Sequence, residues 1–202
     1  ITGANEAVGH YMVQEFTDAE YTDNRHIDLA NRDNIRIQLE HYSPDIIIHC
    51  QEVSSLDRCH KNNEEALLKN AIATMRIAEY AKEGAVIIYI SSGSIFGEEG
   101  KMMPEEDHPD ILPVNYYATS KMYGEWLLRN NRKKGQKIII IRTSWVFGKK
   151  NSKFVEQVLP KIRDNETIYA VDDVRGMPTY AGDLARFVKA VVGELDKFGD
   201  ET

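Results

Sequence analysis

The sequence predicts an α/β protein with a doubly wound parallel sheet and helices on both faces. Residues 46–49, 86–90 and 138–141 are short runs dominated by isoleucine and valine. Such runs are typical of strands that are buried on both faces of a parallel sheet. Segments with helical periodicity separate them, at 63–82 and 114–131. Because strands and helices alternate at this spacing, we expect right-handed crossovers that place helices on both sides of the sheet.

The N-terminal residues indicate two further strands. The chain opens at Ile1-Thr2-Gly3, which has the pattern of a strand end that runs into a turn. We therefore expect this first strand to begin upstream of Ile1. A second strand is expected within residues 16–27, and a loop follows it at Asp28.

The C-terminal part predicts a small extension. Phe154–Arg163 has helical periodicity, residues 167–171 are expected to form a strand, and a second helix follows. No linker rich in glycine or proline separates this part from the rest. We therefore expect a main domain over residues 1–150 and an extension over residues 151–202 that packs on the same domain.

Composition and charge exclude several classes of protein. The 202 residues are 42% hydrophobic and 28% charged, which is typical of a soluble globular chain. The formal net charge is −7 and no basic run occurs, so we expect neither a nucleic-acid surface nor an anionic-membrane surface. No apolar stretch approaches the ~20 residues that span a bilayer, and no signal-peptide pattern occurs. The expected location is the cytoplasm.

Cysteine and histidine spacings predict no metal or redox site. Cys50 and Cys59 match no zinc or redox motif, and we expect them to be thiols in the core or in a loop. The six histidines show no ligand spacing either, so no metal is predicted. They are His10, His26, His41, His49, His60 and His108.

The most informative polar residues are Tyr117 and Lys121, which stand four apart in Asn115-Tyr-Tyr-Ala-Thr-Ser-Lys121. On a helix this spacing puts both side chains on one face. An ammonium beside a phenol favours the phenolate, so we expect Lys121 to lower the pKa of Tyr117 towards the working pH. The rival phenol, Tyr116, has Ser120 rather than a cation four residues on. The alternative is a surface tyrosine that pairs weakly with Lys121.

Two serines, Ser91 and Ser92, follow the predicted strand 86–90. Alternation along a strand places them on opposite sides, and we expect Ser92 to hold a substrate oxygen next to the phenol of Tyr117. A serine of an ordinary strand-end turn has the same pattern. A phenol, an ammonium and a hydroxyl are the groups needed to move a proton on or off an oxygen while a hydride moves on carbon.

The segment 2–9 has the pattern of a turn that binds a dinucleotide's pyrophosphate at a helix N-terminus. Glycines there allow a tight turn and close approach of the backbone to the phosphates, and Gly3 and Gly9 supply two of the three expected positions. Glu6 occupies the third. An ordinary strand-to-helix turn is the alternative. The cofactor-binding candidates of this turn are Gly3, Asn5, Glu6, Ala7, Val8 and Gly9.

A second group of candidates follows the predicted strand 16–27. Asp28 and Leu29 stand where the adenine end of a dinucleotide is often bound, and a helix cap or a solvated loop aspartate is an equal alternative for Asp28. Asp23 favours a free ribose 2′-hydroxyl and Arg25 favours a 2′-phosphate. With both present, the choice between NADH and NADPH stays open.

Four motifs in order carry a resemblance to a known family. Together they resemble the extended short-chain dehydrogenase/reductase superfamily, and within it the dTDP-4-dehydrorhamnose reductases. The resemblance covers nearly the whole chain. The segments are Ile90-Ser-Ser-Gly-Ser-Ile-Phe96-Gly97, Asn115-x-Tyr117-x-x-x-Lys121-x-x-Gly124-Glu125, Ile141-Arg-Thr-Ser-Trp-Val-Phe-Gly148, and Gly176-Met-Pro-Thr179 with Asp183-Leu-Ala185.

The resemblance implies a Rossmann-like fold and a role for each candidate. Tyr117 would protonate the sugar C4 oxygen, Lys121 would tune Tyr117 and hold the nicotinamide ribose, and Ser92 would bind the substrate carbonyl. Asn70 would support the strand that carries Ser92. Thr143 would lie between the nicotinamide and sugar pockets. Residues 1–150 would be the dinucleotide-binding domain, and residues 151–202 part of the substrate-binding region.

Two positions depart from the pattern of these reductases. One is Glu6, which places a carboxylate in the pyrophosphate turn. The other is the segment His49-Cys50-Gln51-Glu52, where the family usually has asparagine followed by small alanines. The resemblance puts Cys50 and Gln51 against the cofactor, and the larger Gln51 is expected to occupy some of its space.

The sequence therefore predicts an enzyme that uses NADPH or NADH to reduce the C4 ketone of a nucleotide-linked 4-keto-6-deoxy sugar, with a homodimer as the candidate assembly. Two alternatives remain open. One is a nucleotide-sugar epimerase or dehydratase of the same superfamily. The other is a non-catalytic binding or regulatory module, similar to the reductase-like regulatory subunit of methionine adenosyltransferase, which the departures at Glu6 and Gln51 favour.

Overall fold

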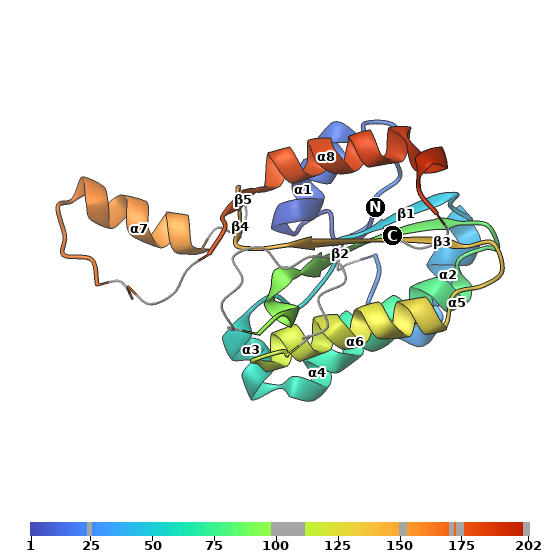
Figure 1. Cartoon of the computed structure of the whole chain (residues 1–202), viewed down its shortest axis with the longest axis horizontal. Helices are drawn as coiled ribbons and strands as arrows, with labels where there is room; N and C mark the ends of the chain where they lie inside the picture. The colour runs from blue at the N-terminus through green and yellow to red at the C-terminus, as the bar shows by residue number, and fades with distance from the viewer. Residues whose placement is uncertain (24–25, 98–111, 150–152, 170–171, 173–175, 200–202) are drawn as a thin grey trace.

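A central parallel sheet is covered by helices on both faces in the computed structural model (Figure 1). The structure describes residues 1–23, 26–97, 112–149, 153–169, 172 and 176–199. The sheet consists of β1 (Ile46–His49), β2 (Val86–Ser92) and β3 (Lys137–Thr143), in that order and all parallel. This confirms the predicted fold class and the three predicted strands.

The N-terminal residues extend this sheet. Thr2 forms parallel bridges with His49 at the end of β1 and with Thr22 on its other side. The chain therefore passes from Thr2 outwards to Thr22, and then returns to the opposite side of Thr2 to form β1. Such a reversal of strand order is the switch point at which α/β proteins bind ligands, beyond the carboxyl ends of the strands.

Alternating residues of the strands form two apolar cores. Ile47, Ile87 and Ile138 face one side, where they pack with α2 (Arg32–Tyr42), α5 (Ala73–Tyr80) and α6 (Tyr116–Asn130). The following residue of each strand faces the other side, towards α1 (Ala7–Glu15) and α8 (Ala181–Gly193). Each strand of this three-stranded sheet is thus covered on both faces, which explains the continuous apolar runs in the sequence.

The helix expected over 63–82 is interrupted. After α3 (Leu56–Lys61), the chain forms α4 (Asn63–Leu67), a π-helical turn η1 (Leu68–Ile72) and then α5. Ser55 and Asn62 cap α3 and α4, because their side chains accept backbone N–H groups. A π-turn inside a helix frequently marks a functional site.

The C-terminal part forms a small second sheet and a helix that packs on the main domain. The two-residue strands β4 (Val146–Phe147) and β5 (Thr179–Tyr180) pair in parallel, and α8 then packs on α1. The strand expected over 167–171 is wrong for residues 167–169, which are not in a strand, and residues 170–171 lie outside the described residues. The short turns η2 (Gly93–Ile95) and η3 (Leu195–Lys197) follow β2 and α8.

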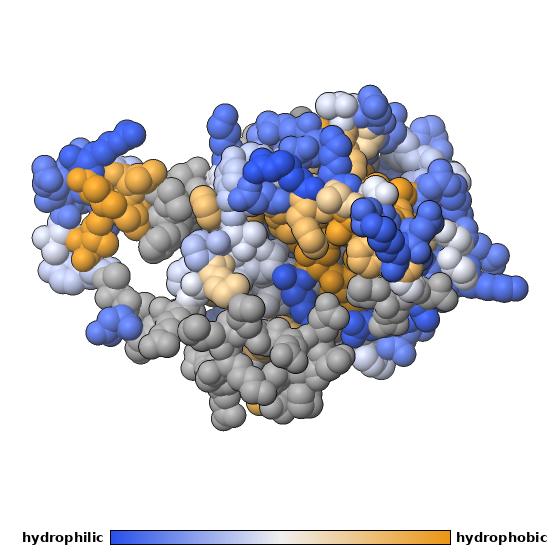
Figure 2. Space-filling model, turned by 45° about the horizontal axis from the view of Figure 1, so that its top comes forward, coloured by the Kyte–Doolittle hydropathy of each residue, from blue (hydrophilic) through white to orange (hydrophobic). Residues whose placement is uncertain are grey.

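Helix α7 (Lys153–Arg163) stands apart from the body (Figure 1). Its residues Leu159 and Ile162 are about half exposed, and Figure 2 shows apolar side chains gathered on this helix. The boundary expected at residue 150 stays a prediction.

Among the described residues, no helix combines the length and the apolar character that a membrane span requires.

Candidate active site

Helix α6 brings Tyr117 and Lys121 to the carboxyl edge of the sheet. Asn115 starts the helix, because its side chain accepts the N–H of Ala118 at 2.8 Å. Lys121 is 1% exposed, and its Nζ donates to the carbonyl of Ile90 on β2 at 2.7 Å. The same ammonium lies 4.3 Å from the centre of the Tyr89 ring. The lysine is therefore a fixed, buried charge and not a surface residue.

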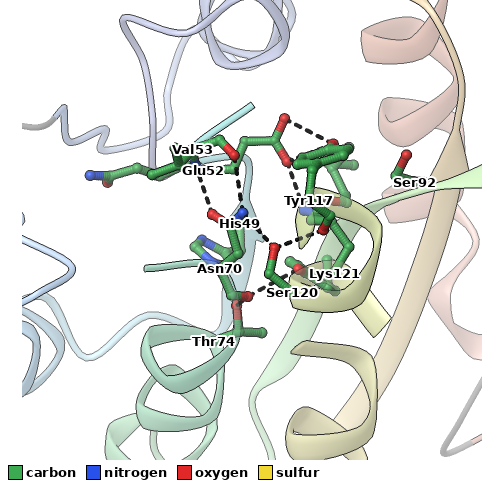
Figure 3. A network of polar contacts seen from close by, with 12 residues as sticks. His49, Glu52, Val53, Asn70, Thr74, Ser92, Tyr117, Ser120 and Lys121 are labelled. Atoms are coloured by element: carbon green, nitrogen blue, oxygen red, sulfur yellow. Dashed lines mark hydrogen bonds and ion pairs between the residues drawn. The ribbon is translucent and has the colours of Figure 1, made fainter. Parts of the chain in front are cut away.

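A third residue, Glu52, contacts both Tyr117 and Lys121, and the sequence analysis did not predict its role. Glu52 lies in the loop after β1, and its Oε2 is 2.8 Å from Lys121 Nζ. The Tyr117 hydroxyl donates to the same carboxylate, at 3.2 and 3.3 Å to its two oxygens (Figure 3). The sequence did contain a signal for Glu52, because this acid follows a predicted buried strand by three residues. The carboxyl ends of parallel strands lie at the same edge of a sheet, which is also where Tyr117 and Lys121 were expected.

The electrostatics of the cluster favour the protonated phenol. Burial of its hydroxyl raises the pKa of Tyr117, and the carboxylate of Glu52 raises it further, against the opposing effects of Lys121 and Ser92. The expected effect of Lys121 thus has the predicted sign, but the net shift is upward. Burial lowers the pKa of Lys121, yet Glu52 and the neighbouring phenols more than offset this and raise it. The site therefore holds a neutral phenol beside an ion pair.

Ser92 ends β2 and lies close enough to Tyr117 to affect its pKa. Its hydroxyl donates to Ser94 Oγ at 3.0 Å and accepts the N–H of Ser94 at 3.2 Å. Thr143 lies beside it in the register of β2 and β3, and the buried Thr143 Oγ1 has no hydrogen-bond partner. Ser91 is 2% exposed, and its buried hydroxyl also has no partner. Ser92, Thr143 and Tyr117 thus share the carboxyl edge.

Asn70, in the π-turn η1, fixes the loop that carries Glu52. Its side chain accepts the N–H of Val53 at 2.7 Å and donates to the carbonyl of Val53 at 3.0 Å. It also donates to Ser120 Oγ on α6 at 2.9 Å. The backbone carbonyl of Asn70 accepts from Tyr89 of β2 at 3.2 Å. Asn70 therefore supports β2, as expected, and in addition clamps the Glu52 loop to α6.

Helix α6 can approach this network closely because of Gly124. A Cβ at Gly124 would lie 2.6 Å from the Asn70 carbonyl oxygen and 2.7 Å from the Tyr89 hydroxyl. Such separations are far below van der Waals contact. The next residue, Glu125, binds Arg142 of β3 at 3.0 and 2.8 Å. These contacts set the position of α6, and hence of Tyr117, against the sheet.

His49 connects this network with the switch point. Its Nδ1 lies 2.7 Å from Thr2 Oγ1 and its Nε2 lies 3.2 Å from Thr74 Oγ1. Thr74 donates its own proton to the Asn70 carbonyl, so we assign the His49 proton to Nε2, with Nδ1 accepting from Thr2. Burial lowers the pKa of His49 to about 3. The imidazole is therefore neutral at physiological pH.

The predicted phosphate turn lies at the switch point. Gly3 has φ +73°, and a Cβ there would lie 2.7 Å from the Gln51 nitrogen. A Cβ at Gly9 would lie 2.0 Å from the Gly3 carbonyl oxygen. Both glycines are thus required by close backbone approach. Asn5 is exposed, Ala7 is buried, and Val8 packs on the core beneath α1.

Glu6 precedes α1 without capping it. Its backbone is extended, and its side chain accepts no hydrogen bond from the first turn of α1. The pKa of Arg58 on α3 is raised first by its hydrogen bond with Glu65, and the charge of Glu6 adds to this shift. The Glu6 carboxylate therefore leaves the N–H groups of the first turn of α1 to other acceptors. The turn fits a bound pyrophosphate in this respect.

Gln51 and Cys50 leave β1 towards the interior. Gln51 is 6% exposed and donates to the carbonyl of Ile27 at 3.1 Å, whereas its buried Oε1 has no hydrogen-bond partner. Cys50 packs in the core beneath α1 and α8, and burial raises the pKa of its thiol to about 12. Cys59 is likewise a buried free thiol, as expected.

The two candidates for the adenine end, Asp28 and Leu29, lie in different environments. Asp28 is exposed, and its side chain accepts the N–H of Ala30 at 2.9 Å, so it stabilises a local turn. Leu29 is 2% exposed and belongs to the core with α2 and α5. Asp23 is buried and binds His26 at 2.9 Å, and Arg25 lies outside the described residues. In the part of the chain that the structure describes, no cluster of three potential metal ligands occurs.

The fold and the site define an α/β protein of the extended short-chain dehydrogenase/reductase type. A family model described as the RmlD substrate binding domain matches residues 1–199. The chain belongs to this family.

Curated relatives agree with the family model. The spore coat polysaccharide biosynthesis protein SpsK of Bacillus subtilis is 33% identical over 193 residues, which cover 93% of this chain and 67% of SpsK. A dTDP-4-dehydrorhamnose reductase of Aggregatibacter actinomycetemcomitans is 29% identical, over 98% of this chain and 70% of its own length. The matched part is only 52% of the reductase of Escherichia coli strain K12.

Solved structures of reductases are similar as well. The dTDP-4-dehydrorhamnose reductase of Bacillus anthracis in complex with NADP is 30% identical, with a TM-score of 0.85 over 96% of this chain and 69% of that chain. The corresponding protein of Clostridium acetobutylicum is 28% identical, with a TM-score of 0.88 over 98% and 70%. A UDP-glucose 4-epimerase of Thermus thermophilus, at 17% identity, shares the fold.

Proposed function

We propose that the protein reduces the C4 ketone of a nucleotide-linked 4-keto-6-deoxy sugar with NADPH or NADH. The observation that carries this proposal is a neutral phenol, Tyr117, held beside Lys121 and Ser92 at the carboxyl edge of the sheet. Its relatives include proteins named dTDP-4-dehydrorhamnose reductases. A group that must protonate a developing alkoxide needs to carry its proton at working pH.

A nicotinamide cofactor, when bound, supplies the hydride. Tyr117 donates its proton to the carbonyl oxygen as the hydride arrives at carbon, and Ser92 orients that oxygen by a hydrogen bond. Lys121, fixed by Ile90 and Glu52, stabilises the negative charge that Tyr117 acquires. Glycines 3 and 9 and the N-terminus of α1 would hold the pyrophosphate, and Gln51 would line the same crevice.

Partners and location follow from this function as predictions. The substrate would be a nucleotide sugar, and the predicted homodimer and the predicted cytoplasmic location accompany the reductase assignment. The choice of NADPH or NADH stays open, although the Bacillus anthracis relative was solved with NADP.

The epimerase and dehydratase alternatives differ from a reductase in how much NADPH or NADH they consume for each sugar converted. A reductase consumes one NADPH or NADH for every keto sugar that it converts, whereas an epimerase keeps its nicotinamide bound and returns it unchanged. Incubation of the protein with a nucleotide-linked 4-keto-6-deoxy sugar and NADPH, with product analysis by mass spectrometry, separates these outcomes. We expect a product two mass units heavier than the substrate, and a product of unchanged mass would contradict the proposal.

The substitution Tyr117→Phe tests the assignment of the acid. We expect kcat to fall by about 10²–10⁴-fold, the usual contribution of a positioned proton donor. The matched control is Tyr116→Phe on the same helix turn, since Tyr116 is exposed and lies outside the cluster. Equal turnover of the two variants would exclude Tyr117 as the proton donor, provided that both unfold at the temperature of the wild type.

A further inference from the structure

We propose that Glu52 returns a proton from solvent to Tyr117 after each turnover, and is thus a proton-relay residue of the active site. This proposal rests on the proposed reductase function and extends it. Reduction leaves Tyr117 as a phenolate, which must regain a proton before a second substrate can be reduced. The contacts of the three groups determine which path that proton can follow.

Glu52 has the contacts that a relay needs. Both of its carboxylate oxygens lie within 3.3 Å of the Tyr117 hydroxyl oxygen, and Oε2 also lies 2.8 Å from Lys121 Nζ. A hydrogen bond already joins the acid that loses the proton to the carboxylate that would replace it (Figure 3). Proton transfer requires no movement beyond hydrogen-bond distance.

Glu52 also has access to water, which Lys121 lacks. The Glu52 side chain is 22% exposed, whereas the Lys121 side chain is 1% exposed. Lys121 also contacts the Ile90 carbonyl and Tyr89. The carbonyl carries no exchangeable proton, and Tyr89, whose hydroxyl donates to the Asn70 carbonyl, is 1% exposed and gives no access to water. Lys121 can therefore exchange its proton with solvent only through Glu52, among the contacts that the structure describes.

Ser92 offers no equivalent path. It is 5% exposed, and its hydroxyl is the group assigned to the substrate oxygen, so it lies against the substrate during turnover. The ring of Tyr117 packs on the small cluster of Val53, Cys59 and Ala66. Besides Lys121 and Ser92, Glu52 is the polar neighbour of the phenol within the part of the chain that the structure describes.

The loop that carries Glu52 is held rigidly. Asn70 binds both backbone polar groups of Val53, the residue next to Glu52, at 2.7 and 3.0 Å. Asn70 itself is 1% exposed and bound to α6 through Ser120. The carboxylate thus keeps its place on Tyr117 by backbone constraint and not by the ion pair alone.

The proton balance of the step is simple. The O–H bond of Tyr117 breaks as its proton goes to the sugar oxygen, which leaves a phenolate. The Glu52 carboxylate takes a proton from water, and the resulting O–H bond breaks as this proton passes to the phenolate. Tyr117 is again a neutral phenol, Glu52 is again a carboxylate, and the hydroxide left in solvent is neutralised by buffer. No oxidant or reductant takes part in this step.

The test separates the first turnover from later ones. Protein that has been mixed with NADPH is combined rapidly with the keto sugar, and NADPH absorbance is followed. In Glu52→Gln, Tyr117 still carries its proton at the start, so we expect one equivalent of NADPH per site to be consumed within about twofold of the wild-type rate. Later turnovers should slow by about 10²-fold, the lower range for positioned proton transfer.

Chemical rescue supplies a second readout. In Glu52→Ala, formate should restore the slow steady-state rate in a saturable manner, because it places a carboxylate in the vacated volume. Chloride at equal ionic strength should not. Glu52→Asp, which keeps the carboxylate, should retain more activity than Glu52→Gln. The matched control is Glu64→Gln, an exposed glutamate at the start of α4, which should show no change.

The possible results distinguish this proposal from the proposed function. If first and later turnovers slow equally in Glu52→Gln, Glu52 acts by positioning, and the relay is excluded. If neither slows, or if formate has no effect on Glu52→Ala, the relay is also excluded. Absence of NADPH consumption by the wild type with any keto sugar contradicts the reductase function instead. Thermal unfolding of each variant identifies loss of fold, and Glu52→Asp keeps the test informative in that case.

Discussion

The two ends of the crevice at the switch point are built in opposite ways. At one end, Glu52, Tyr117 and Lys121 form a cluster in which charge and side-chain hydrogen bonds decide what the site can do. At the other end, Gly3 and Gly9 let three backbone segments meet at distances that no side chain would permit. The first end depends on particular functional groups, and the second depends on the absence of side chains at the two glycines.

This difference separates chemistry from binding. A substitution in the charged cluster removes a proton donor or a charge but leaves the turn intact, so turnover should suffer more than cofactor affinity. A substitution in the glycine turn moves the backbone itself, so cofactor affinity should suffer first. A cluster variant that loses mainly cofactor affinity, or a turn variant that loses mainly turnover, would contradict this distinction.

Among substitutions in the glycine turn, the largest effect on cofactor affinity is expected from Gly9→Ala. The added Cβ would lie 2.0 Å from the Gly3 carbonyl oxygen, so the turn must shift. Overpacking of this kind typically costs about 1–3 kcal/mol, which as binding free energy corresponds to about a 5- to 150-fold loss of NADPH affinity. Fluorescence titration with NADPH measures it.

Gly193→Ala is the matched control for Gly9→Ala. It lies at the end of α8, where an added Cβ meets no atom within 4 Å. Its affinity for NADPH should equal that of the wild type. Wild-type affinity in Gly9→Ala would contradict the account of the turn.

A smaller effect concerns His49, which joins the two ends. Its pKa is about 3 in the folded protein and about 6.5 when unfolded, so the unfolded state binds the proton first as the pH falls. The stabilisation is complete above pH 6.5 and is lost between pH 6.5 and about 3, at about 1.4 kcal/mol per pH unit.

Urea unfolding over this pH range, compared with His49→Asn, measures the contribution of His49. The wild type should lose stability faster than the variant as the pH falls below 6.5. Parallel curves for the two proteins would show that His49 is not buried in its neutral form.

Local pattern sufficed for much of this molecule. The strands β1 to β3 were predictable because burial on both faces demands continuous apolar runs, and Tyr117 and Lys121 because helical spacing alone puts them on one face. The glycines of the turn were predictable because backbone proximity excludes other residues.

Features that depend on distant contacts were not predictable. Glu52 meets Tyr117 across 65 positions, and no periodicity reports such a pair. The upward shift in the pKa of Tyr117 was missed for the same reason, because it arises from burial and from Glu52. The π-turn at Asn70 accompanies contacts with β2 and α6. The strand expected at 167–171 is wrong over 167–169 because apolar residues alone do not make a strand, and Tyr169 is 93% exposed.

The central claim is that the fold holds Tyr117 as a neutral acid next to a carboxylate and an ammonium. Titration of the protein labelled with ¹³C at tyrosine Cζ, followed by NMR and assigned with Tyr117→Phe, measures its ionisation directly. We expect Tyr117 to remain un-ionised at pH 10, where free tyrosine is about half ionised, and its pKa to fall in Glu52→Gln. Ionisation of Tyr117 below pH 10 in the wild type would contradict the account.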